Sequence, residues 1–141
     1  MKLRHFWFAL AGMVCLPAWA ADETLVVTLA GVQHAKGQVR VSLYADPKTF
    51  RKEDKATAIQ TVAPVVGETV VRFEKLPPGR YAIMAYHDED GNGELNRRFG
   101  MFPTEGYGLS NNPTVVGPPK FEDSAFSVPA PDGRVRIEIV Y

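Results

Sequence analysis

The chain has 141 residues, and its 16 Lys and Arg side chains balance 16 Asp and Glu side chains, which gives a formal net charge of zero at pH 7. This length suits one domain with a real hydrophobic core. The balanced charge argues against nucleic-acid binding, which requires a clustered basic face.

The first twenty residues have the pattern of a secretory signal peptide. Lys2 and Arg4 precede an apolar run from Phe6 to Leu16, and Ala18-Trp19-Ala20 suits cleavage after Ala20. The apolar run is far shorter than the roughly twenty residues that span a bilayer. We therefore expect a periplasmic or secreted protein without a transmembrane segment after cleavage.

Cleavage after Ala20 would leave residues 21–141 as a single domain with 14 basic and 16 acidic side chains, because Lys2 and Arg4 are lost. Cys15 is lost as well, so this domain can form neither a disulfide nor a thiolate metal site. A lipid-modified Cys15 is the alternative, but Leu10-Ala11-Gly12 does not directly precede it.

Apolar residues that alternate with polar ones predict strands along most of the remaining chain. The predicted strands lie at residues 25–29, 39–44, 59–62, 71–73, 80–87, 126–128 and 135–141. The segment at residues 80–87 is apolar on both faces, which is typical of a central strand. We expect residues 46–55 to form a connection held down by Phe50, and Pro131-Asp132-Gly133 to form a hairpin turn.

Short strands with turn signals between them, and no long helical stripe, predict an all-β fold. The best account is a two-sheet antiparallel sandwich of immunoglobulin-like or transthyretin-like type. One long segment, residues 88–123, shows no sustained strand or helix period. We expect it to be an ordered loop, because Phe99, Phe102, Tyr107 and Phe121 can pack it onto the sandwich.

The start of this segment has the spacing of a calcium-binding loop. Asp88, Asp90 and Asn92 occupy positions 1, 3 and 5, which supply side-chain oxygens, and Gly93 occupies the turn position. Glu94 at position 7 would offer its backbone carbonyl, and Asn96 at position 9 would ligate directly or through water. Leu95 would point inward.

The loop lacks one ligand of the helical calcium-binding motif, because position 12 is Phe99. Glu105 is the nearest acidic residue that could return to the site, with Glu89 and Glu94 as weaker candidates. The alternative is that Asp, Asn and Gly simply form good turns and that their side chains cap their own backbone.

A catalytic role has weaker support. His87 could act as a base on Ser110 with Asp88 orienting its ring, or together with neighbouring carboxylates, as in a cell-envelope hydrolase. No nucleophile elbow surrounds Ser110, however, and an ordinary strand-end histidine explains His87 equally well. We therefore do not predict an enzyme from this sequence.

Aromatic and amide side chains in the long segment could form a ligand-binding rim. The candidate residues are Phe102, Tyr107, Asn111, Asn112 and Phe121. The partner would be a small molecule, a glycan or a protein of the cell envelope. The alternative is that these side chains only seal the loop, as in a purely structural envelope protein.

Three motifs together resemble the bacterial DUF2141 family of exported proteins. They are the run from Phe73 to Leu95, the segment from Gly100 to Asn112, and Gly117-Pro118-Pro119-Lys120-Phe121. The resemblance implies an exported bacterial domain and no particular activity. Leu76 to Tyr86 is also similar to transthyretin-like and carboxypeptidase-regulatory-like sandwiches, which supports the fold alone.

Overall fold

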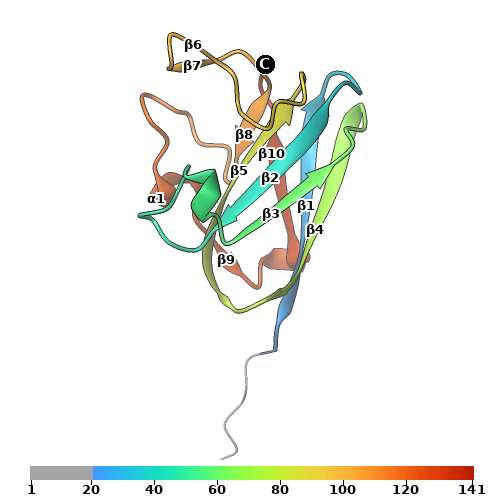
Figure 1. The fold of residues 1–141 in the computed structure, drawn as a ribbon. Coiled ribbons are helices and arrows are strands. Elements are labelled where there is room, and N and C mark those ends of the chain that lie inside the picture. Colours follow the sequence, from blue (N-terminus) through green and yellow to red (C-terminus); the bar gives the residue numbers. More distant parts are fainter. Residues whose placement is uncertain (1–20) are drawn as a thin grey trace, which may run out of the picture.

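Strands form most of the regular structure in the computed structural model, which describes residues 21–141 (Figure 1). The predicted signal peptide and Cys15 lie outside these residues. The strands are β1 (Glu23–Val32), β2 (Gln38–Tyr44), β3 (Ala58–Val62), β4 (Gly67–Leu76), β5 (Gly79–Asp88), β6 (Arg97–Arg98), β7 (Phe102–Pro103), β8 (Tyr107–Leu109), β9 (Phe126–Val128) and β10 (Arg134–Glu138). The helical turns are η1 (Glu53–Lys55), α1 (Phe121–Ser124) and η2 (Pro131–Gly133).

Alternating side chains of the strands fill the space between two sheets. In β1, Leu25, Val27 and Leu29 are fully buried, whereas the residues between them are partly exposed. Val41 of β2 and Ile83 of β5 reach the same core from the facing sheet. Burying a side chain of this size stabilises the fold by roughly 1.5–3 kcal/mol. The prediction that a period of two builds the sandwich core is confirmed.

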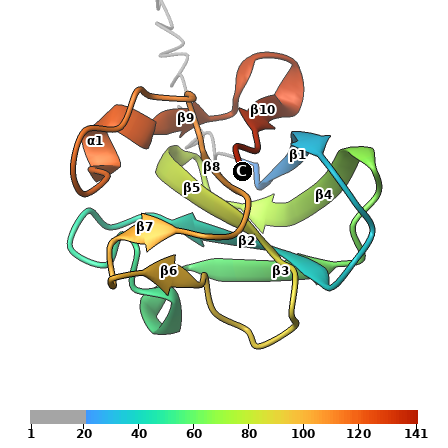
Figure 2. The ribbon, with the colours of Figure 1, turned by 90° about the horizontal axis from the view of Figure 1, so that it is seen from above.

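The two sheets have the strand orders β10-β1-β4 and β3-β2-β5-β8, and β9 also pairs with β5 (Figure 2). In the smaller sheet, Val27 of β1 lies opposite Val71 of β4 and Val135 of β10. The β1–β10 pair is parallel, and every other strand pair is antiparallel. The predicted all-β sandwich is therefore confirmed, with one parallel pair at its edge.

Strand β5 is central, as its apolar character on both faces predicted. Every residue from Tyr81 to Asp88 is buried. One face contributes Tyr81, Ile83 and Ala85 to the core between the sheets. The other face joins a second apolar cluster, in which Phe50, Leu95 and Phe121 come from connecting segments and cover the outer side of the sheet. The predicted roles of Phe50 and Leu95 are confirmed.

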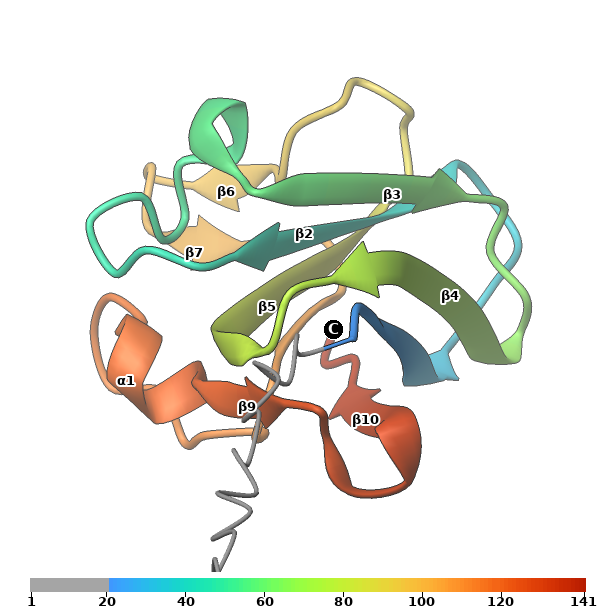
Figure 3. The same ribbon diagram turned by 90° about the horizontal axis from the view of Figure 1, so that it is seen from below.

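The predicted hairpin at Pro131-Asp132-Gly133 is wrong. These residues form η2, which leads from β9 on β5 to β10 on β1, so the two strands belong to different sheets. In Figure 3 the two strands are joined by a wide loop and lie beside different partners. Pro129 and Pro131 lack the backbone N–H groups that the ladder of a tight hairpin would need.

The long segment at residues 88–123 is ordered but more regular than expected. It contains the β6–β7 hairpin and strand β8, which pairs with β5. The expectation that four aromatic side chains hold it down is only half right. Phe121 is buried and Tyr107 is half-buried, but Phe99 and Phe102 of the hairpin are 83% and 61% exposed.

Candidate functional site

Asp88 is a buried carboxylate at the point where β5 ends and the acidic loop begins. Its Oδ1 accepts a hydrogen bond from the Asn92 backbone N–H at 3.0 Å. Its Oδ2 accepts from the Gly93 backbone N–H at 2.8 Å and from the Gln38 amide at 2.7 Å. Gly91 and Gly93 both have a positive φ, which allows the tight turn. Asp88 therefore fixes the shape of the loop.

Hydrogen bonds control the ionisation of Asp88. Burial alone would raise the pKa of this carboxyl, but the hydrogen bonds that it accepts from Gln38, Gly93 and Asn92 outweigh burial. The pKa of Asp88 is therefore below its ordinary value, because donors to a carboxylate favour its charged form. The site keeps a buried negative charge at neutral pH.

Glu105 returns to the acidic loop from the segment after β7 and is also buried. Its Oε1 accepts a hydrogen bond from the Glu89 backbone N–H at 2.9 Å, and its Oε2 accepts from the Asn96 backbone N–H at 3.0 Å. One side chain thus joins both ends of the loop. The sequence left Glu105, Glu89 and Glu94 as alternatives, and the structure places Glu105 at the loop.

Three carboxylates meet at this point. One oxygen each of Asp88, Asp90 and Glu105 lies within 4.8 Å of the other two. Two unit charges 4.8 Å apart repel each other by about 3.5 kcal/mol at an effective dielectric constant near 20. A cation between the three groups would remove this repulsion, and an array of hard oxygen atoms suits Ca²⁺. We call Asp88, Asp90 and Glu105 the acidic triad.

The two asparagines predicted as ligands lie beside the triad. The Asn96 Nδ2 donates to Asp90 Oδ2 at 2.7 Å, and the Asn92 Nδ2 donates to Asn96 Oδ1 at 2.6 Å. Rotating either amide would turn an oxygen toward Asp90 in place of a nitrogen. Glu94, which is predicted to offer its backbone carbonyl, lines a pocket on the outer face of the larger sheet. The structure therefore gathers five of the six predicted ligands by their side chains.

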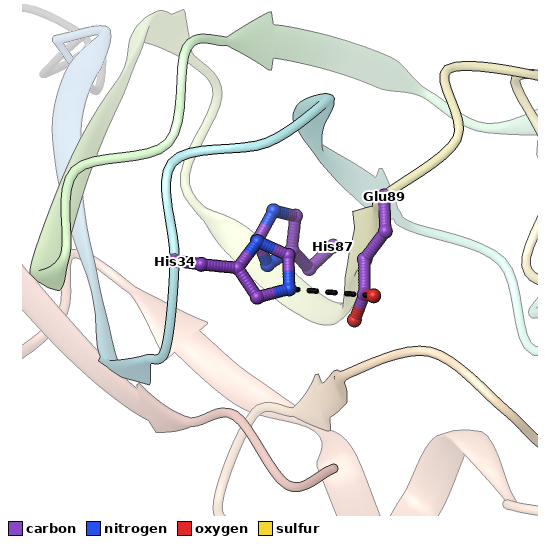
Figure 4. A group of neighbouring side chains, drawn as sticks. All are labelled: His34, His87 and Glu89. Carbon is purple, nitrogen blue, oxygen red and sulfur yellow. Dashed lines mark ion pairs between the residues drawn. The ribbon is translucent and has the colours of Figure 1, made fainter.

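A histidine cluster lies next to the acidic loop, and sequence reasoning missed it (Figure 4). The His34 ring centroid lies 4.5 Å from that of buried His87, and His34 Nε2 lies 3.3 Å from Glu89 Oε2. The pairing of Gln38 with Asp88 explains the contact, because antiparallel register brings residues before β2 close to residues after β5. The sequence predicts strands β2 and β5, but it does not determine their register against each other.

Both ring nitrogens of His87 are occupied. Nε2 lies 2.6 Å from the Lys36 carbonyl oxygen, which can only accept, so Nε2 carries the proton. Nδ1 lies 2.6 Å from the hydroxyl of Tyr141, which also accepts a hydrogen bond from the Gln33 backbone N–H. Both nitrogens of His87 therefore have partners within the domain, and neither is free for a metal or a substrate.

Ser110 does not face His87. Its Oγ accepts from the Ile83 backbone N–H at 2.9 Å and donates to the Ser124 carbonyl, and the residue is fully buried. Ile83 lies four residues before His87 on an extended strand, which separates the two residues along β5 by roughly 13 Å. Ser110 and His87 therefore do not form the nucleophile and base pair of the hydrolase hypothesis.

The five residues of the predicted ligand rim do not form one surface. Phe121 is buried, and Phe102 is exposed on the hairpin. The Asn111 amide donates to the Ala125 carbonyl at 2.7 Å, and the Asn112 amide binds the backbone of β10 through Glu138 N–H at 2.8 Å. Tyr107 and Asn112 line one pocket, which has a volume of about 230 Å³.

A larger pocket of about 340 Å³ lies on the outer face of the larger sheet, between η1 and the acidic loop. Tyr86 forms part of its lining, and its hydroxyl lies 2.9 Å from both Glu53 Oε2 and the Gly93 carbonyl oxygen. Burial, followed by the bond to Glu53, raises the pKa of Tyr86. This protonated hydroxyl therefore ties the acidic loop to the sheet.

The fold and the acidic loop define an all-β domain with a candidate cation site at one end of its central strand. The chain belongs to DUF2141, a family described as uncharacterised proteins conserved in bacteria, whose model matches residues 27–136. No curated protein and no solved structure matches the chain. Within residues 21–141, no helix has the length and apolar character needed to cross a bilayer.

Proposed function

We propose that this protein is an exported calcium-binding module of the bacterial cell envelope. The single observation that carries the proposal is the convergence of the acidic triad, in which two of the three carboxylates are buried. Buried charges of one sign are costly unless they are paired or coordinate a metal. A bound divalent cation would supply the missing opposite charge.

The donor set favours calcium over zinc or magnesium. Carboxylate, amide and backbone oxygens are hard ligands, and calcium accepts six to eight of them in a flexible arrangement. A carboxylate has about four acceptor sites, of which Asp88 uses three and Glu105 two for hydrogen bonds. Both side chains therefore keep acceptor capacity for an ion without releasing the loop.

Export is the second part of the proposal and has its support in residues 1–20, which combine a basic start, an apolar run and small residues before Ala21. A location in the periplasm or outside the cell would suit a weak calcium site, because extracellular modules bind calcium with dissociation constants of about 0.1–1 mM. The ordered loop would then present a binding surface to a small molecule, a glycan or a protein of the envelope.

The proposal is tested by removing metal from the domain with a chelator and then titrating the domain with calcium in a calorimeter. We expect one site in residues 21–141, and we expect Asp90→Asn to remove most of the heat. Asp90 suits this test because it is exposed and its hydrogen bonds are local to the loop, so the variant should fold. Glu94→Gln is the matched control, since it removes a neighbouring carboxylate outside the triad. An absence of heat in the wild type, or equal losses in both variants, would refute the calcium site.

A further inference from the structure

The tip of the β6–β7 hairpin exposes an apolar surface that the calcium proposal does not use. Phe99, Met101 and Phe102 are 83%, 68% and 61% exposed, and none belongs to a hydrophobic cluster of the described residues. Figure 1 shows the hairpin at one end of the molecule, opposite the β4–β5 turn. Large side chains grouped in this way on a surface mark an interaction site.

Phe99, at the turn of the hairpin, is an unfavourable residue for the stability of the domain. Phe99 and Gly100 both have a positive φ, 54° and 67°, as in the two-residue turns that favour Asn, Asp or Gly at the first position. A bulky side chain in this left-handed conformation is strained. Because the Phe99 side chain is almost fully solvated, no packing within the domain offsets this strain. The residue is therefore better explained by a contact outside the domain.

The hairpin has a firm base that holds the tip in place. The Thr104 backbone N–H donates to the Asn96 carbonyl at 2.9 Å, and Arg98 pairs with Phe102 across the two strands. Below this point, Glu105 holds Asn96 through its backbone N–H. The apolar side chains thus project from an ordered support, and docking them would require little loss of backbone entropy.

Two arginines flank the apolar tip. Arg97 and Arg98 are both exposed, and neither forms an ion pair with any residue in the described part of the chain. When apolar side chains enter the acyl boundary of a bilayer, basic side chains beside them lie at the level of the lipid phosphates. The pattern of apolar tip and basic flank therefore complements an anionic lipid surface.

We propose that Phe99, Met101 and Phe102 insert into the interface of an anionic membrane, with Arg97 and Arg98 contacting the lipid phosphates. A bilayer fits a small convex tip because it needs no complementary shape. A protein partner would have to bury about 800 Å² on each side for a stable complex, which is far more than three side chains provide. This proposal does not depend on calcium binding.

Tryptophan fluorescence tests the insertion directly, because both tryptophans of the chain lie in residues 1–20. The fragment of residues 21–141 contains both sheets and both apolar clusters, so it is the unit to measure. With Met101→Trp, we expect a blue shift on adding vesicles of phosphatidylglycerol and phosphatidylcholine in equal amounts, with quenching by brominated acyl chains. Val116→Trp is the matched control, since Val116 is 93% exposed in another loop.

The Phe99→Asn variant distinguishes an effect on membrane binding from an effect on folding. Asparagine suits the turn, so we expect an unchanged or higher melting temperature together with a vesicle partition coefficient about tenfold lower, as for the loss of one large inserted side chain. Arg97→Gln with Arg98→Gln should weaken binding to anionic vesicles and leave the weak binding to pure phosphatidylcholine unchanged.

Several outcomes would overturn the membrane proposal. One is a wild type that does not bind vesicles, and another is a Phe99→Asn variant that binds as tightly as the wild type. Equal spectral shifts for the Met101→Trp and Val116→Trp variants would show non-specific adsorption. Self-association abolished by Phe99→Asn, without vesicle binding, would assign the tip to contacts between copies of the chain.

Discussion

At the scale of single residues, Asp88 has the structural role that the alternative interpretation of the loop predicts, because its side chain caps backbone N–H groups of its own loop. Its carboxylate accepts three hydrogen bonds while fully buried. In Asp88→Asn, an NH2 group replaces one carboxylate oxygen. This group cannot accept a hydrogen bond from the donors that surround it. We expect the free energy of unfolding in chelator to fall by about 2 kcal/mol, as for the loss of hydrogen bonds to a charged group. Urea denaturation measures this loss, and a stability equal to that of the wild type would contradict the assigned role.

The same residue predicts a dependence of stability on pH. The pKa of Asp88 is lower in the fold than the ordinary value of about 3.9. The contribution of Asp88 to the free energy of unfolding is therefore fully present above about pH 3.9, the ordinary pKa. It is lost as the pH falls through the lower pKa that Asp88 has in the folded domain. In chelator, the wild type should lose more stability than Asp88→Asn below about pH 4. Parallel stability curves for the two proteins would exclude this contribution.

At the scale of elements, β8 depends on a close approach to β10. A Cβ added at Gly108 would lie 2.5 Å from the Glu138 carbonyl oxygen, which is backbone and cannot move aside easily. Gly108→Ala should therefore lower the free energy of unfolding by about 1–3 kcal/mol, as for overpacking. Gly79→Ala in β5 is the control, because its Cβ would meet only ordinary contacts. Equal thermal stability of the two variants would disprove the predicted clash.

The sequence predicts elements well where a period of two coincides with burial. Strands β1, β2 and β5 follow directly from alternating residues such as Leu25 and Val27. The link from β9 to β10 could not be predicted, because Pro131-Asp132-Gly133 forms a turn whether the flanking strands share a sheet or not. Pairing with β1 and burial of Ile137 place β10 in the other sheet.

The candidate site shows a similar limit. Spacing along the chain identified Asp88, Asp90 and the turn glycines, because these groups are local. Glu105 was one of several candidates, because its return depends on the length and course of the β6–β7 hairpin. The contact between His34 and His87 was missed, because it depends on the register of β2 against β5.

At the scale of the whole molecule, calcium should stabilise the folded domain through mass action. With a dissociation constant of about 0.1 mM, 1 mM calcium would add about 1.4 kcal/mol to the free energy of unfolding. Differential scanning calorimetry with calcium and with chelator measures this gain. Asp90→Asn should abolish the difference, and Glu94→Gln should keep it. A gain that persists in Asp90→Asn would place the ion elsewhere.

A crystal structure of residues 21–141 grown with calcium tests the calcium site most directly. We expect one strong density peak that lies about 2.3–2.6 Å from carboxylate oxygens of Asp88, Asp90 and Glu105, as calcium coordination requires. A triad that holds only water at saturating calcium, or an ion bound at a different place, would contradict it.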